Sequence, residues 1–255
     1  MKLAAWNVNS LKIRLPHLLE WLATEQPDVV CLQETKLEDH GFPRQEIEAA
    51  GYETACSGQK TYNGVALLSR RGLSDVACSN PHYPDPQKRL IAATVGDVRV
   101  ISAYVPNGQA IGSEKYAYKL GWLEALEKWL SEELTQYPQL AIAGDFNIAP
   151  ENRDVHDPAA WAGQVLCSEP ERDAFRRLLS LGLHDSFRLF EQPENSFSWW
   201  DYRMLGFQKN RGLRIDHILL SAPLAARCRT SKIVREMRKR ERPSDHAPVV
   251  VELAD

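Results

Sequence analysis

The stretch Leu140-Ala141-Ile142-Ala143-Gly144-Asp145-Phe146-Asn147 joins an apolar run to an Asp and an Asn two positions apart. A continuous apolar run is typical of a strand covered on both faces. Alternation along an extended chain points Asp145 and Asn147 to the same side. The stretch Val29-Val30-Cys31-Leu32-Gln33-Glu34-Thr35 has the same design and ends in the carboxylate of Glu34. A charge at the end of a buried strand needs a partner, and a metal ion is one such partner.

Short apolar strands alternate with helical segments along the whole chain, and no Gly/Ser-rich or Pro-rich linker divides it. We therefore expect one domain over residues 1–255. Two β-rich layers covered by helices account for this alternation. The predicted strands are Leu3 to Trp6, Val29 to Leu32, Val65 to Leu68, Ile91 to Val95, Val98 to Tyr104, Leu140 to Ala143, Ser196 to Trp200, Arg214 to Leu220 and Val249 to Leu253.

Three helices have clear start and stop signals. Pro16 is expected in the first turn of a helix that runs to about Glu25. A longer helix is predicted from near Ser113 to just before Pro138, with leucines at helical spacing. The third begins at the capping box Ser168-Glu169-Pro170-Glu171 and ends at Gly182.

The composition is that of a globular enzyme-sized protein. Of 255 residues, 44% are hydrophobic and 25% charged, which excludes disorder, collagen and coiled coil. No apolar run approaches the roughly 18 residues that cross a bilayer, and the N-terminus turns polar too soon for a secretory signal. The five cysteines lack zinc-site spacing, so we expect reduced thiols. We expect a cytoplasmic monomer with no membrane partner.

The net charge of −3 conceals an asymmetry between the two ends of the chain. Residues 1–200 carry 19 Lys+Arg against 27 Asp+Glu, whereas residues 201–255 carry 12 against 7. The basic end, with Arg211, Arg214 and the run Arg235 to Arg242, has two interpretations. It contacts the phosphates of a polyanion, or it is a solvated basic face.

Polar residues gather at the predicted strand ends. Besides the two stretches above, Asn7 and Asn9 follow the first strand, and two later segments place acids at strand boundaries, Arg214-Ile215-Asp216-His217 and Ser244-Asp245-His246-Ala247-Pro248. Such a set is hard to explain as core packing. Carboxylate and amide oxygens suit Mg²⁺ or Mn²⁺ rather than zinc.

The whole motif set resembles the exonuclease III family, the class II abasic-site endonucleases of the endonuclease/exonuclease/phosphatase superfamily. The motifs that carry the resemblance are Trp6-Asn7-Val8-Asn9, Leu32-Gln33-Glu34-Thr35, Tyr104-Val105-Pro106-Asn107, Gly144-Asp145-Phe146-Asn147, Arg214-Ile215-Asp216 and Ser244-Asp245-His246-Ala247-Pro248. The resemblance spans residues 1–253. It implies a DNase I-like, four-layered α/β sandwich of two packed mixed β-sheets flanked by helices, with the active site at one end.

The resemblance also implies roles for single residues. Glu34 is the principal Mg²⁺ ligand, within a metal-binding set of Asn7, Glu34, Asp145, Asn147, Asp245 and His246 that Asn9 supports. Asp145 aligns or deprotonates the attacking water, and Asn147 holds the scissile phosphate. His246 binds a phosphate oxygen and is oriented by Asp216, while Tyr104 lies near the leaving oxygen. Mn²⁺ can substitute for Mg²⁺.

The remaining roles concern DNA. Tyr62 and Asn107 are expected to contact the DNA backbone, together with Arg211. By the resemblance, Trp199, Leu213 and Ile215 line a pocket for a flipped abasic deoxyribose.

The predicted function is therefore Mg²⁺-dependent phosphodiester hydrolysis in base excision repair. The substrate is double-stranded DNA with abasic sites or 3′ ends, and the balance between 3′-to-5′ exonuclease and abasic-site cleavage is left open. One alternative is another phosphoesterase of the superfamily, such as an inositol polyphosphate phosphatase or a sphingomyelinase. The other is a non-catalytic DNA-binding module, which has no need for an intact acid set.

Overall fold

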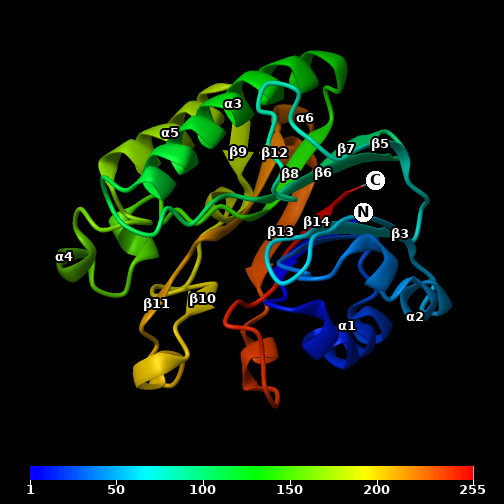
Figure 1. The fold of residues 1–255 in the computed structure, drawn as a ribbon, viewed down its shortest axis with the longest axis horizontal. Coiled ribbons are helices and arrows are strands. Elements are labelled where there is room, and N and C mark those ends of the chain that lie inside the picture. Colours follow the sequence, from blue (N-terminus) through cyan, green and yellow to red (C-terminus); the bar gives the residue numbers. More distant parts are fainter. Residues whose placement is uncertain (255) are drawn as a thin grey trace.

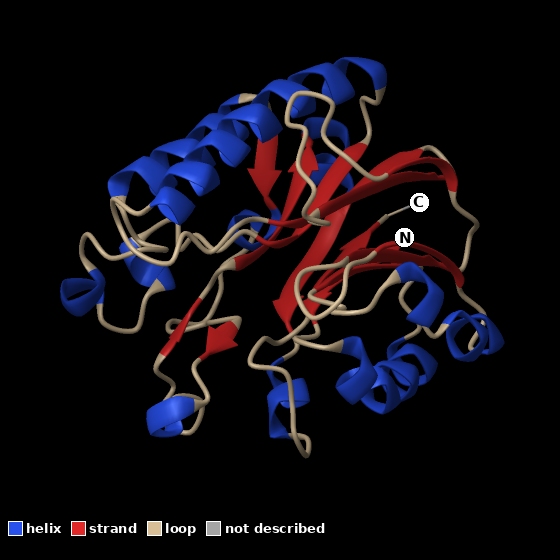
Figure 2. Ribbon diagram, viewed as in Figure 1, coloured by secondary structure: helices blue, strands red, loops and turns tan. Residues whose placement is uncertain are grey.

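Two six-stranded mixed sheets lie face to face in the computed structural model, which describes residues 1–254 (Figures 1 and 2). The first sheet has the order β13 (Cys228–Ile233), β14 (Val249–Leu253), β1 (Lys2–Asn7), β2 (Val29–Gln33), β4 (Val65–Ser69) and β3 (Glu53–Ser57). The second has the order β5 (Ser74–Ala77), β6 (Leu90–Val95), β7 (Val98–Tyr104), β8 (Leu140–Asp145), β12 (Asp216–Ser221) and β9 (Leu183–Asp185).

Helices cover the outer faces of both sheets. Helices α1 (Leu11–Glu25) and α2 (Arg44–Ala49) lie on the first sheet, and α3 (Glu114–Gln136) and α5 (Glu169–Ser180) lie side by side on the second (Figure 1). The short helices α4 (Pro158–Trp161) and α6 (Ala222–Arg227) and a two-stranded ribbon of β10 (Trp199–Trp200) and β11 (Gly212–Leu213) complete the regular structure, together with 3-10 turns at Asp39–Gly41, Asn152–Asp154, Ser186–Leu189, Arg203–Leu205 and Arg235–Lys239.

Alternation along the strands builds the layers. In β1, Leu3 and Ala5 face the second sheet, while Ala4 and Trp6 face α1. Three apolar clusters therefore stack in order, one under α1, one between the sheets and one under α3 and α5. The predicted four-layered α/β sandwich is confirmed.

The start of α1 differs from the prediction. The helix begins at Leu11, so Pro16 lies inside it rather than in its first turn. The backbone N–H groups of Ser10 and Leu11 donate to the carbonyls of Glu34 and Thr35. These distant partners take the place of a start signal within the helix sequence. The capping box at Ser168 is present with both of its hydrogen bonds.

The strands that sequence patterns missed are short or lie near the sheet edges. Strands β3, β5 and β13 are largely half-buried or exposed, so they lack the continuous apolar run that marks the central strands. The predicted strand Arg214 to Leu220 begins two residues too early, because β11 ends at Leu213 and β12 begins only at Asp216. Arg214, between them, is buried against two acids.

The register around β8 positions the chemistry. Asp145 pairs with Tyr104 of β7 on one side and with Asp216 of β12 on the other. Gly144 permits this close approach, since its φ is 150° and a Cβ there would lie 2.0 Å from the carbonyl oxygen of Ala103. Over residues 1–254, we find no helix with the length and apolar character that a membrane crossing requires.

Candidate active site

The amide of Asn7 joins carboxylates that come from different sheets. Its Nδ2 donates to Oε1 of Glu34 at 2.9 Å and to Oδ2 of Asp145 at 2.9 Å. Asn7 ends β1 and Asp145 ends β8, while Glu34 directly follows β2. Facing strand ends therefore bring together three residues that the sequence predicted as a metal-binding group.

His246, in the C-terminal segment, faces the carboxylate of Asp145. Its Nε2 lies 3.7 Å from Oδ2 of Asp145, and its Nδ1 lies 2.9 Å from Oδ2 of Asp216. Asp216 is itself held by Ser198, whose hydroxyl donates to Oδ2 at 2.7 Å and accepts the backbone N–H of Asp216. The ring of His246 thus contacts Asp216 through Nδ1, and Ser198 holds the carboxylate of Asp216. Ser198 carried no sequence signal.

Burial and neighbouring charges set the protonation of these groups. Burial raises the pKa of Asp145 to about 7, although attraction to His246 opposes the shift. Burial works against charge on His246, but the carboxylates of Asp216 and Asp145 outweigh it and raise the pKa of His246 to about 10. Burial, followed by the nearby Glu34 and Asp145, also raises the pKa of Tyr104 well above its usual value. Tyr104 and His246 are therefore protonated at neutral pH.

The geometry fits a metal ion. One ligand atom each from Glu34, Asp145 and His246 lies within 4.8 Å of the others. The oxygens are those of carboxylates, the donors that Mg²⁺ prefers. Glu34 and Asn147 have φ values of 52° and 50°, a costly backbone for these residues that is concentrated at functional sites.

Lys36 is a site residue that the sequence analysis did not select. Its Nζ lies 2.9 Å from Oε2 of Glu34 and 2.5 Å from Oδ1 of Asn9. The carboxylate of Glu34 thus has a lysine partner two residues along the chain. The spacing Glu-Thr-Lys was the available signal, and only the left-handed turn at Glu34 and Lys36 brings the two charges together.

Asp245 lies beside this cluster with both carboxylate oxygens engaged. Oδ1 accepts from Nδ2 of Asn9 at 2.8 Å, and Oδ2 accepts from Nε1 of Trp199 at 3.0 Å. Burial raises the pKa of Asp245, but attraction to His246 and these two hydrogen bonds outweigh it and hold the pKa below its usual value. Asp245 therefore lies next to the group of Glu34, Asp145 and His246 rather than within it.

The predicted phosphate-holding amides are paired with each other. Nδ2 of Asn107 donates to Oδ1 of Asn147 at 3.1 Å, and Nδ2 of Asn147 donates to the carbonyl of Val105 at 3.0 Å. The backbone N–H of Asn147 donates to Oδ1 of Asp145 at 2.9 Å. Asn107, Asn147 and Asp145 therefore form one continuous polar edge.

Trp199, Leu213 and Ile215 are brought together, but as a packed cluster. Trp199 pairs with Leu213 across the ribbon, and Leu213 and Ile215 are 0% and 1% exposed. They pack with Val155 and Leu166, from the segment between β8 and α5. An extruded sugar enters only if this cluster opens, so the pocket for a flipped sugar stays a prediction.

Several cations of the basic C-terminal end are paired with acids or buried within the protein. Arg214 is buried between Asp154 and Asp185, with its Nε 2.6 Å from Asp154 Oδ1. The expectation that Arg214 contacts phosphate is therefore wrong. In the predicted basic run, Lys239 pairs with Glu236, Arg240 pairs with Glu20, and Arg238 is only 6% exposed. Tyr62 and Arg211 remain exposed, as a DNA contact requires.

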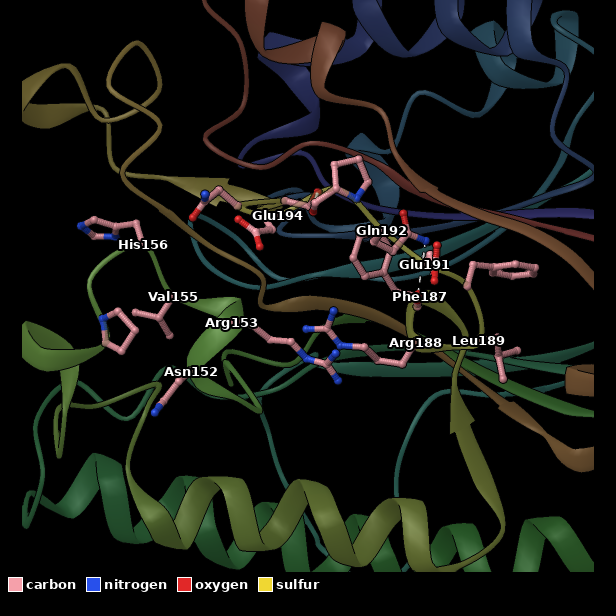
Figure 3. Close-up of a pocket in the computed structure, with 15 residues that line it drawn as sticks. Asn152, Arg153, Val155, His156, Phe187, Arg188, Leu189, Glu191, Gln192 and Glu194 are labelled. Carbon is pink, nitrogen blue, oxygen red and sulfur yellow. Dashed lines mark hydrogen bonds between the residues drawn. The ribbon is translucent and has the colours of Figure 1, made fainter.

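A cavity of about 880 Å³ is separate from the group of Glu34, Asp145 and His246, none of which lines it (Figure 3). Segments 152–158 and 187–196 line it, and Figure 3 shows Arg153 and Arg188 extending toward one another across it. Their guanidinium groups pair with Glu151 and Asp154. The lining residues include none of the predicted site residues.

Comparison with known proteins places the chain among nucleases. Residues 4–246 match the Endonuclease/Exonuclease/phosphatase family. The chain is 40% identical to exodeoxyribonuclease III of Haemophilus influenzae over 99% of both chains, and 33% identical to an exodeoxyribonuclease of Bacillus subtilis over 98% of both.

Solved structures show the same relationship. The 3′ phosphatase NExo from Neisseria, bound to a product DNA hairpin, has a TM-score of 0.99 and 46% identity and covers 100% of both chains. An AP endonuclease from Archaeoglobus fulgidus has a TM-score of 0.95 and 38% identity over 99% of both chains.

Proposed function

The chain belongs to the endonuclease/exonuclease/phosphatase family and is a DNA repair nuclease, and from this premise we propose its substrate, its metal and the residues that carry the reaction. The proposed reaction is hydrolysis of a phosphodiester in double-stranded DNA, at a 3′ end or on the 5′ side of an abasic site. The observation that carries this proposal is the placement of the Asp145 carboxylate between Asn7 and His246.

We propose that Asp145 aligns the attacking water and takes its proton. A base works best when its pKa lies near the working pH, and burial raises the pKa of Asp145 to about 7. The protonated ring of His246, fixed by Asp216, is placed to stabilise negative charge on a phosphate oxygen. The phenol of Tyr104 keeps its proton at neutral pH and is proposed to donate near the leaving oxygen.

The proposed phosphate and DNA contacts come from four residues. Asn107 and Asn147 present their amides side by side, and Tyr62 and Arg211 have exposed side chains. Phosphate contacts set the register of the duplex and carry no sequence information, so we propose little sequence preference.

Mg²⁺ is the proposed cofactor, with Mn²⁺ able to replace it. When bound, Mg²⁺ supplies a Lewis acid that offsets negative charge on the phosphate oxygens. Glu34 and Asp145 are the proposed main ligands, with Asn7, Asn147 and Asp245 around them, while the protonated His246 has no free lone pair for a metal and keeps its role toward the phosphate. The amide of Asn7 holds the two carboxylates at a common point, which opposes their mutual repulsion.

We further propose a monomer of one domain over residues 1–255 that acts in the cytoplasm. Pairing of β14 with β1 supports the single domain, because it joins the two ends of the chain in one sheet. The five free cysteines support a reducing compartment.

A DNA substrate is proposed ahead of an inositol polyphosphate or a sphingomyelin. The relatives that match this chain over nearly its full length are named as exodeoxyribonucleases and an AP endonuclease. An intact carboxylate group also argues against the non-catalytic module.

One experiment tests the whole proposal. The purified protein is incubated with duplexes carrying an abasic site, a recessed 3′ end or a 3′-blocked nick, with Mg²⁺ and then with EDTA. We expect Mg²⁺-dependent cleavage of at least one duplex, and a loss of about 10²- to 10⁴-fold in kcat for Asp145→Asn with DNA binding retained. Full activity in EDTA, or wild-type kcat for Asp145→Asn, contradicts the proposal.

A further inference from the structure

Lys119 lies beneath the active site and is fully buried. It belongs to α3, which otherwise presents apolar side chains to the second sheet. Its Nζ donates to the carbonyl oxygen of Asn147 at 2.6 Å and to that of Asn107 at 3.2 Å. These are the two residues whose amides form the phosphate edge. The third partner is Oε1 of Glu171, at 2.5 Å.

Glu171 extends the contact to a separate segment of the chain. Its Oε1 also accepts the backbone N–H of Leu166 at 3.0 Å, and its Oε2 accepts the backbone N–H of Ser168 at 3.0 Å. Leu166 belongs to the apolar cluster that contains Leu213 and Ile215. The Lys119–Glu171 pair therefore connects the phosphate edge with the wall beside Trp199.

We propose that Lys119 is a positioning residue, which fixes the backbone of Asn107 and Asn147 relative to the segment Leu166–Ser168. The inference rests on the proposed function, since it assigns a consequence for catalysis to the geometry of that site. Lys119 touches no reacting atom and acts only through the two asparagines and Glu171.

Two features separate this role from ordinary packing. A buried ion pair is a weak source of stability, because the cost of removing both charges from water offsets their attraction. Apolar residues of similar size would therefore stabilise the fold equally well at these two positions. Asn147 also has a left-handed backbone, with φ 50°, and a donor on its carbonyl opposes relaxation to a cheaper conformation.

The turn at Gly108 fits the same interpretation. Its φ is 93°, and a Cβ there would lie 3.1 Å from Cδ of Lys119 and 3.2 Å from Cγ2 of Val165. The aliphatic stem of Lys119 thus packs against the turn that carries Asn107, while its ammonium group holds the carbonyls. The stem and the charge of Lys119 thus both contact the segment of Asn107 and Gly108.

The test compares Lys119→Met, Glu171→Gln and the double variant Lys119→Met/Glu171→Gln, with Lys128→Met as a matched control on the exposed face of α3. Lys119→Met alone leaves Glu171 buried without its cation and should lower the melting midpoint. The double variant removes both charges and should recover most of that midpoint. Its kcat on a recessed 3′ end should still be about 10- to 100-fold lower, with KM within about twofold of wild type, because the asparagine carbonyls lack their donor.

Hydrogen–deuterium exchange gives a readout that does not depend on activity. Segments 105–109 and 145–149 should exchange faster in the double variant than in wild type, and the control should match wild type in every measurement. Wild-type kcat and exchange in the double variant would show that Lys119 only neutralises Glu171, and would overturn the inference. If the double variant does not fold, Lys119→Arg replaces it in the test. Arginine keeps the charge but cannot place its donors at the same point, so we expect the same loss of kcat. Wild-type kcat in Lys119→Arg would overturn the inference.

A wild-type protein without metal-dependent DNA cleavage would contradict the proposed function instead. In that case the exchange of segments 105–109 and 145–149 still decides the role of Lys119.

Discussion

Nδ1 of His246 lies 2.9 Å from Oδ2 of Asp216, although 30 positions separate the two residues in the chain. Both are buried, and the opposite ring nitrogen, Nε2, faces Asp145. The carboxylate of Asp216 therefore fixes the direction of the ring, and together with Asp145 it favours the charged form of His246.

This pairing predicts that Asp216 acts through His246. His246→Ala should lower kcat by about 10²- to 10⁴-fold, the range for a single group that assists the transition state. Asp216→Ala should give a similar loss, and the double variant should lose little more, because an orienting group acts through the residue it orients. Single-turnover rates of the three variants measure this. Additive losses would show that Asp216 has a separate role.

Glu34→Gln should weaken activation by Mg²⁺ far more than it weakens folding. The substitution keeps the size of the side chain and removes the charge that faces Asn7 and Lys36. The measurement is the Mg²⁺ concentration for half-maximal rate, together with the melting midpoint without metal. Glu38→Gln, an exposed acid four residues along, is the control and should match wild type. An unchanged Mg²⁺ requirement in Glu34→Gln would remove Glu34 from the ligand set.

The dependence of DNA binding on salt should distinguish two exposed basic residues, Arg211 and Lys239, of which Lys239 is paired with an acid. Each lost phosphate contact reduces the slope of log K against log salt concentration by about 0.9. Arg211→Gln should show this reduction, since Arg211 is exposed. Lys239→Gln should not, because Lys239 already pairs with Glu236 at 2.8 Å. The reverse result would show that the Lys239 pair opens to bind DNA.

Trp199→Ala should reduce abasic-site cleavage more than 3′-exonuclease activity. We expect an extruded sugar to need the cluster around Trp199, Leu213 and Ile215, whereas a paired 3′ end should not need it. Trp199→Phe keeps the ring and removes the hydrogen bond to Asp245, so it separates the apolar wall from the contact with that carboxylate. Both rates and the melting midpoint are measured on one preparation. Equal losses with a destabilisation of about 3–5 kcal/mol would identify Trp199 as core packing.

The contribution of His217 to stability should fall in mild acid. Burial, together with the nearby Arg214, lowers the pKa of His217 to about 4, while an unfolded histidine titrates near about 6.5. The unfolded state then binds the extra proton first, so stability is lost as the pH falls from about 6.5 towards about 4, by up to about 3 kcal/mol. Denaturant unfolding at several pH values measures this loss.

His217→Gln is expected to flatten that pH dependence, because a neutral amide can still meet Arg214 and the carbonyl of Ile148. His184→Gln, at an exposed position, is the control and should keep the wild-type slope. An unchanged slope in His217→Gln would assign the acid sensitivity to other groups.

Much of the fold could be predicted from local patterns. The central strands were found because their residues face apolar layers on both sides, as in β2 and β8, where every residue is buried. The edge strand β3 and the outer strand β13 were missed because half-exposed residues leave no such run. The start of α1 was misplaced because its first N–H groups are satisfied by Glu34 and Thr35, far from the helix in sequence.

The sequence by itself determined the family and which residue types stand at the strand ends, since motif order and apolar runs are local properties of the chain. Tertiary structure alone decided which charges neutralise one another. Arg214 and Arg240 resemble free cations in the sequence, yet Asp154, Asp185 and Glu20 hold them. It also decided that Lys119 reaches Asn107 and Asn147, and that Leu213 and Ile215 pack closed. The physical reason is that Coulomb attraction and exclusion of water depend on distances through space, which the packing of two sheets creates and local patterns do not encode.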